Sequence, residues 1–301
     1  MKIARHNKSV LWSLIISITV LWGYAWVLMK ASLQYMGPFT FSSYRFLTGT
    51  LALFVVLLLL KIGFPHKRYW KHLFVVGILQ TAIVFLLVMY GLKFVGAGKS
   101  SVLLYSMPIW SSFLAAKFLQ ERLSLKKLCG LVVGLIGLLI IFGSDLFKQD
   151  QMIIIGEILI ILAAISWGIS NVYFRIYLHQ LPKLQTSAFQ MLFGTIGIVV
   201  VTLIMEPGMP VEWNMESIYY ILFTGVVASA LCFTVWFIIL SSIDIVTATI
   251  STLLVPIFGL IFSHILLGEK ITVSIMVGTL FIISGIIISQ QREKRKSHEV
   301  G

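Results

Sequence analysis

The stretch YSMPIWSSFLAAKFLQERLS, from Tyr105 to Ser124, holds a proline inside an apolar run and a glutamate at the end of that run. Pro108 removes one hydrogen bond from a helix interior and frees the carbonyl four residues earlier. Glu121 would place a negative charge at a helix C-terminus, where the helix dipole disfavours it. Both features are unusual in a helix, so a second occurrence of the pair would indicate a repeated unit.

A second copy does occur, as PIFGLIFSHILLGEKIT over residues 256–272. Pro256 follows Pro108 by 148 residues, and Glu269 follows Glu121 by the same distance. Other residues match at this offset or, over the first two apolar runs of each half, at an offset of 145. The matching pairs are Trp22 and Trp167, Gly23 and Gly168, Gly49 and Gly194, Thr50 and Thr195, Gly77 and Gly225, Phe85 and Phe233, Gly130 and Gly278, and Gly137 and Gly285. The chain is therefore predicted to consist of two copies of one unit.

The composition predicts an all-α membrane protein. The 301 residues are 59% hydrophobic and only 11% charged, with a mean hydropathy of +1.00, whereas a soluble domain is about half apolar and about a quarter charged. The apolar residues come in long runs without strand-like alternation, which indicates transmembrane helices. Ten spans are predicted, at residues 10–29, 39–60, 71–92, 98–119, 126–143, 152–173, 184–205, 217–240, 246–267 and 272–290. The connections are too short to hold a soluble domain.

The net charge of +12 reflects membrane orientation rather than nucleic-acid binding. With a cytoplasmic N-terminus, the tails and inner loops hold 16 Lys and Arg residues and the outer loops hold 5, while Arg45 and Lys117 lie within spans. This bias is the positive-inside pattern, with both termini in the cytoplasm. The basic tail at 291–301 is expected to contact anionic lipids.

Five spans in each unit, an odd number, place the second unit in the membrane with the opposite orientation. The units comprise residues 10–143 and 152–290. Inverted repeats are typical of secondary transporters, in which a central cavity lies near the membrane midplane between the repeats. Exchange of conformations between the two units would open such a cavity to one side or the other.

Pro108 and Pro256 are both expected near the membrane midplane. Pro108 lies about 20 Å from Glu121 by helix rise, and Pro256 reaches the same depth from the other side. A carbonyl freed by proline is tolerated in a membrane only where it is paired again or faces a wet cavity. The two kinks are therefore interpreted as shaping or gating a central pathway, with simple packing between helices as the alternative.

Glu121 and Glu269 are expected to brace tight helical hairpins. The next helices begin near good N-cap residues, Ser124 and Thr272, so each carboxylate can bind the free N–H groups there or the basic residue beside it. A role in proton coupling is the alternative for this pair.

Aromatic residues lie deep within the first and sixth spans. Trp22, Tyr24 and Trp26 are too deep for an interfacial aromatic belt. Trp167 matches Trp22, and Asn171 lies one helical turn further along the same face. We expect these residues to line a cavity for a partly apolar substrate, although helix packing explains them equally well.

Arg45 is the most informative charged residue, because an arginine about 10 Å inside a span is costly and indicates a functional site. It would bind a carboxylate or phosphate of a substrate, or else pair with a polar neighbour for structural reasons. Its match in the second half is Gln190, which is polar but uncharged. Tyr105 and Thr252 add polar groups within their spans and are further candidates for substrate contact.

Catalytic and metal-binding motifs are not found. Gly98, Lys99 and Ser100 resemble the end of a phosphate-binding loop, but Lys93 occupies the position of its first glycine. Cys129 and Cys232 have no metal or disulfide spacing, and Glu157 lies near the start of its span rather than at mid-membrane. Catalytic residues, metal ions and cofactors are therefore not predicted.

These residues give the chain a resemblance to a known family. In the first half they are Trp22, Gly23, Lys30, Pro38, Arg45, Tyr90, Gly91, Leu92, Pro108, Glu121, Arg122, Leu123, Ser124, Gly130 and Gly137. In the second half they are Trp167, Gly168, Pro256, Gly268, Glu269, Lys270, Ile271, Thr272, Gly278 and Gly285. The pattern resembles two units of the EamA family of the drug/metabolite transporter superfamily. The first unit departs from it at Gln120, where the pattern has the glycine seen at Gly268.

The resemblance implies ten helices in two inverted five-helix units around a central cavity, with the fifth and tenth helices peripheral. It implies a multi-pass permease of the bacterial plasma (inner) membrane, often an exporter of amino acids or other small metabolites, that works by alternating access and requires no cofactor. Two other classes remain open, a membrane-embedded enzyme and a receptor or scaffold that transports nothing. Membrane lipids and a small-molecule substrate are the expected partners, and the sequence leaves a homodimer undecided.

Overall fold

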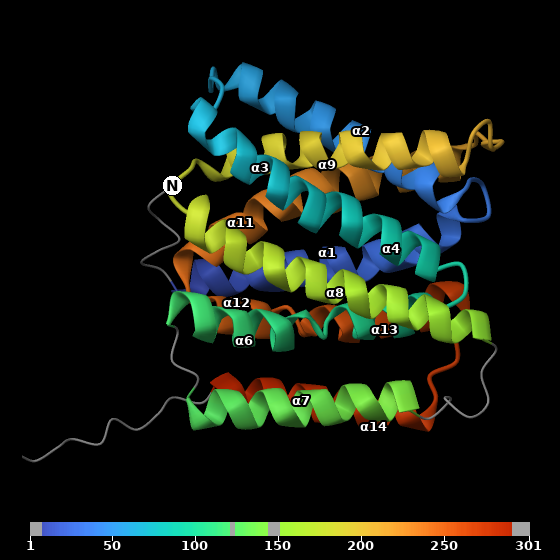
Figure 1. Cartoon of the computed structure of the whole chain (residues 1–301). Helices are drawn as coiled ribbons and strands as arrows, with labels where there is room; N and C mark the ends of the chain where they lie inside the picture. The colour runs from blue at the N-terminus through green and yellow to red at the C-terminus, as the bar shows by residue number, and fades with distance from the viewer. Residues whose placement is uncertain (1–7, 121–123, 144–150, 291–301) are drawn as a thin grey trace, which may run out of the picture.

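The computed structural model describes residues 8–120, 124–143 and 151–290, and these residues form helices without any strand. The helices lie side by side in a bundle (Figure 1). Glu121 and the tail at 291–301 lie outside the described residues.

Eight helical segments of the described chain are long and apolar enough to cross a membrane. They are α1 (Lys8–Ser32), α2 (Pro38–Leu59), η2–α3–η3–α4 (Lys67–Gly91), α5–α6 (Ala97–Leu119), α8 (Gln151–Tyr177), α9 (Lys183–Met205), α10–η4–α11 (Met215–Ser242) and α12–α13 (Ile245–Leu267). Two further helices, α7 (Leu125–Gly143) and α14 (Val273–Gln290), pack against each other as a separate layer at the edge of the bundle (Figure 1).

The two segments with a central proline are broken rather than kinked. Helix α5 (Ala97–Leu104) ends before α6 (Met107–Leu119) begins, and Pro108 lies in the first turn of α6. Likewise α12 (Ile245–Ser251) precedes α13 (Leu254–Leu267), in which Pro256 is the third residue. A proline in a first turn removes an N–H that has no helical partner. Each of these two spans therefore consists of two short helices joined by a two-residue turn.

The backbone at the second break pairs within its own turn. The carbonyl of Thr252, which the proline was expected to free, accepts a hydrogen bond of 2.9 Å from the N–H of Val255. The helix ends past the two breaks also match, because both take a left-handed conformation, at Gln120 (φ 53°) and Gly268 (φ 66°). Gln120 thus adopts the conformation that the pattern otherwise assigns to glycine.

Two π-helical segments allow close contacts between the two halves. Segment η3 (Gly77–Ile83) faces α9, and η4 (Phe223–Leu231) faces α2. A Cβ on Gly225 would lie 2.5 Å from the carbonyl oxygen of Arg45, and a Cβ on Gly77 would meet the carbonyl oxygen of Gln190. These positions require glycine because the neighbouring backbone occupies the space of a side chain.

These close contacts occur in reciprocal pairs. Where a residue of the first half meets a residue of the second, the residues that match them at offsets of 145 and 148 also meet each other. The pairs are Gly49 against Gly225 and Gly194 against Gly77, Gly23 against Phe258 and Gly168 against Trp110, and Gly137 against Gly278 and Gly285 against Gly130. Matching residues of the two copies therefore make equivalent contacts across the interface between the halves.

Candidate functional site

A small cavity lies where the two halves meet, with eight of its nine lining residues from the first half and Trp167 from the second. Its volume is about 20 Å³, which accommodates a water molecule but not an organic compound. Helices α1, α2, α4, α5 and α8 supply its walls. The lining residues are Trp22, Ala25, Trp26, Met29, Arg45, Phe85, Leu104, Tyr105 and Trp167. The structure therefore brings five of the residues predicted from the sequence to one place: Trp22, Trp26, Arg45, Tyr105 and Trp167.

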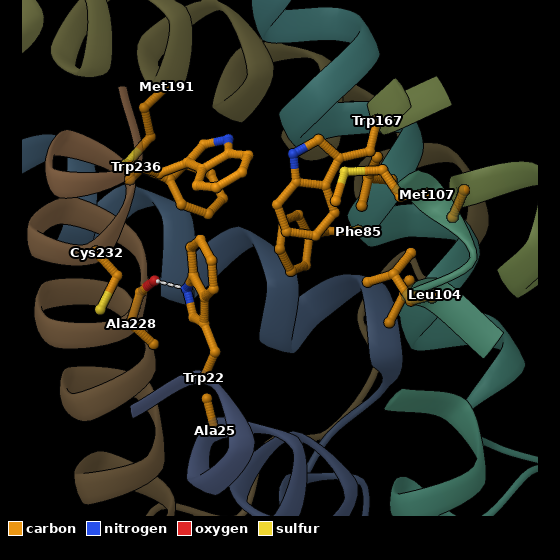
Figure 2. Packing of buried hydrophobic residues seen from close by; sticks show 14 of the residues in the cluster. Trp22, Ala25, Phe85, Leu104, Met107, Trp167, Met191, Ala228, Cys232 and Trp236 are labelled. Atoms are coloured by element: carbon orange, nitrogen blue, oxygen red, sulfur yellow. Dashed lines mark hydrogen bonds between the residues drawn. The ribbon is translucent and has the colours of Figure 1, made fainter. Parts of the chain in front are cut away.

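Trp22 is the centre of the aromatic cluster that bounds this cavity (Figure 2). Its ring makes edge contacts with Trp167, Phe233 and Trp236 at centroid distances of 5.8, 6.2 and 6.0 Å. Its Nε1 donates a 2.9 Å hydrogen bond to the carbonyl oxygen of Ala228 in η4. Edge-to-face contacts and a paired indole N–H fix the orientation of this ring.

Arg45 is fully enclosed beside these rings, with only 2% of its surface exposed. Its guanidinium carbon lies 4.3 Å from the centroid of Phe85 and 4.9 Å from that of Phe46. Its Nε donates to Ser229 Oγ at 2.9 Å, and its Nη1 donates to the thioether of Met29 at 2.7 Å. Thioether sulfur is a weak acceptor.

Carboxylates do not compensate Arg45 in the described structure. Over residues 8–120, 124–143 and 151–290, none has an oxygen within 4.0 Å of the guanidinium nitrogens. The cation–π contacts with Phe85 and Phe46 offset part of the desolvation of this charge. A buried cation whose contacts are a hydroxyl, a thioether and two aromatic rings is suited to attract an anion.

Trp167 contributes a donor that, unlike Arg45, has no hydrogen-bond partner in the described structure. Its indole is 3% exposed, and its Nε1 is buried without a hydrogen-bond acceptor. The matching Trp22 donates to a carbonyl oxygen, so the two copies differ at this position. A buried N–H without a partner is costly, and this one belongs to a ring that lines the cavity.

Asn171 lies next to the cluster but outside the cavity lining. Its Oδ1 accepts a 3.2 Å hydrogen bond from Trp236 Nε1, and its Nδ2 donates to the sulfur of Met107 at 2.9 Å. It therefore connects the three elements α8, α11 and α6. In this conformation it positions the ring of Trp236.

Tyr24 and Thr252 are not brought to the cavity. Tyr24 points to another face of α1, where its hydroxyl lies 3.2 Å from that of Tyr219 and its ring packs against Phe223 and Phe262. Thr252 is buried and donates from Oγ1 to the carbonyl oxygen of Thr249 at 2.7 Å. The contacts of both residues differ from the substrate-facing position expected from the sequence.

Glu269 binds free N–H groups at the start of a helix, where the helix dipole favours a negative charge. This helix is α5 and not the next helix along the chain, α14. The two carboxylate oxygens of Glu269 accept from the backbone N–H groups of Ala97 (2.7 Å) and Gly98 (3.0 Å) at the start of α5. The contact therefore joins the two halves rather than bracing the local hairpin. The corresponding contacts of Glu121 lie outside the described residues.

A second acidic residue, Glu206, makes a similar contact that sequence reasoning missed. Its carboxylate accepts from the backbone N–H of Thr40 at 2.8 Å and the hydroxyl of Thr40 at 2.7 Å, at the start of α2. Helix N-termini carry free donors and a positive dipole end, which both favour a carboxylate. Glu206 comes directly after an apolar span, which is the one local signal that points to it.

Basic residues bind carbonyl oxygens at the C-terminal ends of helices, at matching positions in the two halves. Lys30 donates to the carbonyl oxygens of Leu92 (2.5 Å) and Val95 (3.1 Å) beyond α4. Arg175, 145 residues later, donates to those of Leu240 in the last turn of α11 and of Ile243 just beyond it. These acceptors are themselves 148 residues apart, so the same contact occurs in both halves.

Glu157 and Lys99 form a buried ion pair that the sequence did not predict. Their charged atoms are 2.5 Å apart, and the Glu157 side chain is fully buried while that of Lys99 is 14% exposed. The geometry is a charge contact rather than an aligned hydrogen bond. The matched positions in the other copies are Trp12 and Thr247. The pair joins α8 of the second half to α5 of the first, and it has no counterpart at the matched positions.

Several cluster residues were not singled out as site residues from the sequence. Phe85 and Phe233 match at the 148-residue offset, and this signal marks them as related without assigning a role. Trp236 and Ser229 reach the cluster only through packing of distant helices, whereas Met29 lies on α1 with Trp22 and Trp26. Among the described residues, no group of three His, Cys, Asp or Glu residues is close enough to hold a metal ion.

Comparison with known proteins gives a consistent result. The model of the EamA-like transporter family matches residues 9–143 and 154–290. A Bacillus subtilis protein named "Uncharacterized transporter YoaV" is 33% identical over 91% of this chain and 94% of its own length. A Salmonella typhimurium "Probable amino-acid metabolite efflux pump" is 24% identical over 90% of this chain and 92% of its own length.

A solved crystal structure has the same fold, with a TM-score of 0.74 and 16% sequence identity over 94% of this chain and 97% of that one. The described chain is helical throughout, and eight of its helical segments are long and apolar enough to span a membrane. The two family matches together cover nearly the whole chain, in the two halves that carry the internal repeat. The chain is a multi-pass membrane protein that belongs to the EamA-like transporter family.

Proposed function

We propose that this protein is a secondary transporter that exports a small organic metabolite, such as an amino acid, by alternating access. The observation that carries the proposal is the cavity lined by residues of both halves, in which Arg45 is buried without a nearby carboxylate among the described residues. An intramembrane cation at a repeat interface fits a substrate site. The names of relatives as efflux pumps support export and an amino-acid-like substrate.

The membrane arrangement proposed with it is ten spans in two inverted five-helix units, with both termini in the cytoplasm of a bacterial cell. Helices α7 and α14 supply the fifth and tenth spans at the periphery. Support comes from the paired contacts at offsets of 145 and 148, and from the excess of basic residues on one side.

The broken helices supply the moving parts of the proposed cycle. The links between α5 and α6 and between α12 and α13 lie at matching positions in the two halves. Tyr105, in the first link, lines the cavity. Short helices joined by such links reorient with less backbone distortion than continuous helices, so the cavity can widen toward one side at a time.

Counterflow in proteoliposomes tests the proposed function. The purified protein is reconstituted with a high internal concentration of one unlabelled metabolite, and uptake of the labelled metabolite is followed across a panel of amino acids and organic acids. We expect protein-dependent exchange of at least one compound. Absence of exchange across the whole panel, with correctly folded and inserted protein, would contradict transport.

Arg45→Gln tests the role of the buried charge in the same assay. The glutamine keeps hydrogen-bonding capacity, as Gln190 does in the other half, but removes the charge. We expect loss of exchange with unchanged expression and an unchanged elution profile in detergent. Loss of folded protein instead would assign Arg45 to structure.

A further inference from the structure

The polar groups and charge of the central cavity indicate a class of substrate, and an inference about that class rests on the proposed function and makes it more specific. The unused or weakly used polar groups in the cavity lining are donors. The guanidinium of Arg45 has a thioether as one of its acceptors, and Trp167 Nε1 is buried without any acceptor. Both residues line the same cavity. A ligand that completes these groups must supply acceptor atoms.

The charge of the lining is also one-sided. Arg45 is the positively charged residue among the nine lining residues, and none of the nine is Asp or Glu. A carboxylate would neutralise the guanidinium and accept hydrogen bonds from it. An ammonium group of the same ligand would be buried beside a like charge, without a carboxylate partner in the lining.

The remaining walls are apolar and aromatic. Trp22, Trp26, Phe85 and Trp167 contribute rings, and Ala25 and Leu104 contribute aliphatic surface. Aromatic faces also attract cations, but the face of Phe85 is already occupied by the guanidinium of Arg45 at 4.3 Å. The walls therefore suit the apolar or aromatic body of a ligand rather than a second charged group.

We propose that the central cavity selects a monocarboxylate that carries an apolar or aromatic body and lacks an ammonium group. When the cavity widens in the proposed cycle, the carboxylate of the ligand binds Arg45 and accepts the N–H of Trp167, and the body of the ligand packs among the rings of the cluster. The substrate class is then an organic acid with one negative charge, in preference to the zwitterionic amino acid of the same shape.

Three probes with one phenyl ring and different charges test this selectivity. Binding of radiolabelled 3-phenylpropanoate, an anion, is measured on the full-length protein in detergent at neutral pH. Unlabelled 3-phenylpropanoate, phenylalanine and 2-phenylethylamine then compete as anion, zwitterion and cation. We expect the anion to compete at a concentration at least about tenfold lower than the zwitterion, the change associated with one charge-assisted interaction, and the cation to compete least.

Two variants separate the proposed contacts from general effects on the fold. Trp167→Phe removes the indole N–H and keeps a ring in the cavity, so affinity for the anion should fall several-fold while the order of the three probes is kept. Trp110→Phe is the matched control, because Trp110 Nε1 is also buried without a partner but Trp110 is not part of the cavity lining. The affinity of the Trp110→Phe variant for 3-phenylpropanoate should equal that of the wild type.

The results distinguish this inference from the proposed function. Equal or stronger competition by phenylalanine overturns selection for a monocarboxylate, and exchange of that amino acid in proteoliposomes would still support transport. Equal losses in Trp167→Phe and Trp110→Phe overturn the contact with Trp167. Binding of none of the probes overturns the inference, and the counterflow panel then reports on transport separately.

Discussion

Single charged side chains in this protein are held mainly by helix ends. Glu269 and Glu206 bind free N–H groups at helix starts, while Lys30 and Arg175 bind free carbonyl groups at helix ends. Each contact places a charge where the helix dipole favours it. Arg45 is different, because its contacts include neither a helix end nor a described carboxylate. At the scale of residues, this difference separates structural charges from the candidate substrate contact.

Asp244 provides a pH-dependent test of such a helix-end contact. It lies between membrane spans, and its Oδ1 accepts 2.9 Å hydrogen bonds from the N–H of Thr247 and from Lys127 Nζ. Burial raises the pKa of Asp244, but the hydrogen bonds from Lys127 and Thr247 outweigh it, so the net pKa lies below the usual value. A lowered folded-state pKa stabilises the fold above the unfolded-state pKa of about 3.9, and this contribution is lost as the pH falls through the folded-state pKa.

We therefore expect Asp244→Asn to be less stable than the wild type at pH 6–8, by up to about 1 kcal/mol. The difference should shrink as the pH falls below about 4, where the carboxylate of the unfolded chain becomes protonated, and it should be lost below the lowered folded-state pKa. Thermal unfolding in detergent across this pH range measures it. Asp244→Ala is the comparison, because it also loses the N-cap and should cost about 1 kcal/mol more. A constant difference between wild type and Asp244→Asn down to pH 3 would contradict the assigned charge contact.

Helices of the two halves meet through glycine, and this feature governs packing at the scale of elements. Their backbones approach so closely that a single methyl group would collide with a carbonyl oxygen. Without a hydrophobic driving force between helices in lipid, such close packing is a main source of association. The π-helical segments η3 and η4 bring glycine into these contacts on both sides of the bundle.

Gly225→Ala should therefore destabilise the protein by about 1–3 kcal/mol, since the new methyl group would lie 2.5 Å from the carbonyl oxygen of Arg45. Gly134→Ala in α7 is the matched control, because no atom lies within 4 Å of its added methyl group. Alanine there should be neutral or stabilise by up to about 1 kcal/mol through helix propensity. Reversible unfolding in mixed micelles gives both values, and equal effects of the two substitutions would contradict the contact.

The buried pair of Glu157 and Lys99 ties α8 to α5 across the two halves. Glu157→Gln removes the carboxylate that pairs with Lys99 and should destabilise the protein by about 3–5 kcal/mol. The double variant with Lys99→Met should lose less stability than the sum of the two single variants, because the interaction between the two charges is lost only once. The same unfolding assay on all four proteins measures the coupling energy. Additive losses would show that the two charges do not interact.

At the scale of the whole molecule, the two halves are related by reciprocal contacts, in which matching residues of the two halves make equivalent interactions. The residue offsets of 145 and 148 found in the sequence recur in glycine contacts and in the Lys30 and Arg175 contacts. Such exchange is what two inverted units would produce around a shared axis. The buried pair Glu157–Lys99 and the free N–H of Trp167 are departures from this relation.

Matching loop positions test the inverted arrangement directly. Gln34 and His179 are exposed, follow the first span of each unit, and are 145 residues apart. In a variant without Cys129 and Cys232, we expect Gln34→Cys to react with a membrane-impermeant maleimide added outside intact cells. His179→Cys should react only after the membrane is opened. Labelling of both positions from the same side would contradict inverted units, and transport by the cysteine-free parent serves as the control.

The sequence by itself determined the helical class, the positions of the apolar spans, the two-unit repeat and the residues that interrupt the spans. These properties follow from local composition and spacing, because about 20 apolar residues suffice for a span and a proline restricts its own turn. The grouping of Trp22, Trp26, Arg45, Tyr105 and Trp167 around one cavity also agrees with expectations from depth and matching position.

Only the tertiary structure decided which side chains face the cavity and which partners they have. Tyr24, two residues from Trp22, turns away from it, because a difference of two residues is more than half a helical turn. Glu269 reaches α5 rather than the adjacent helix, 172 positions away from Ala97. Spacing along one helix fixes the depth of a residue in the membrane, but the packing of distant helices fixes what lies opposite it.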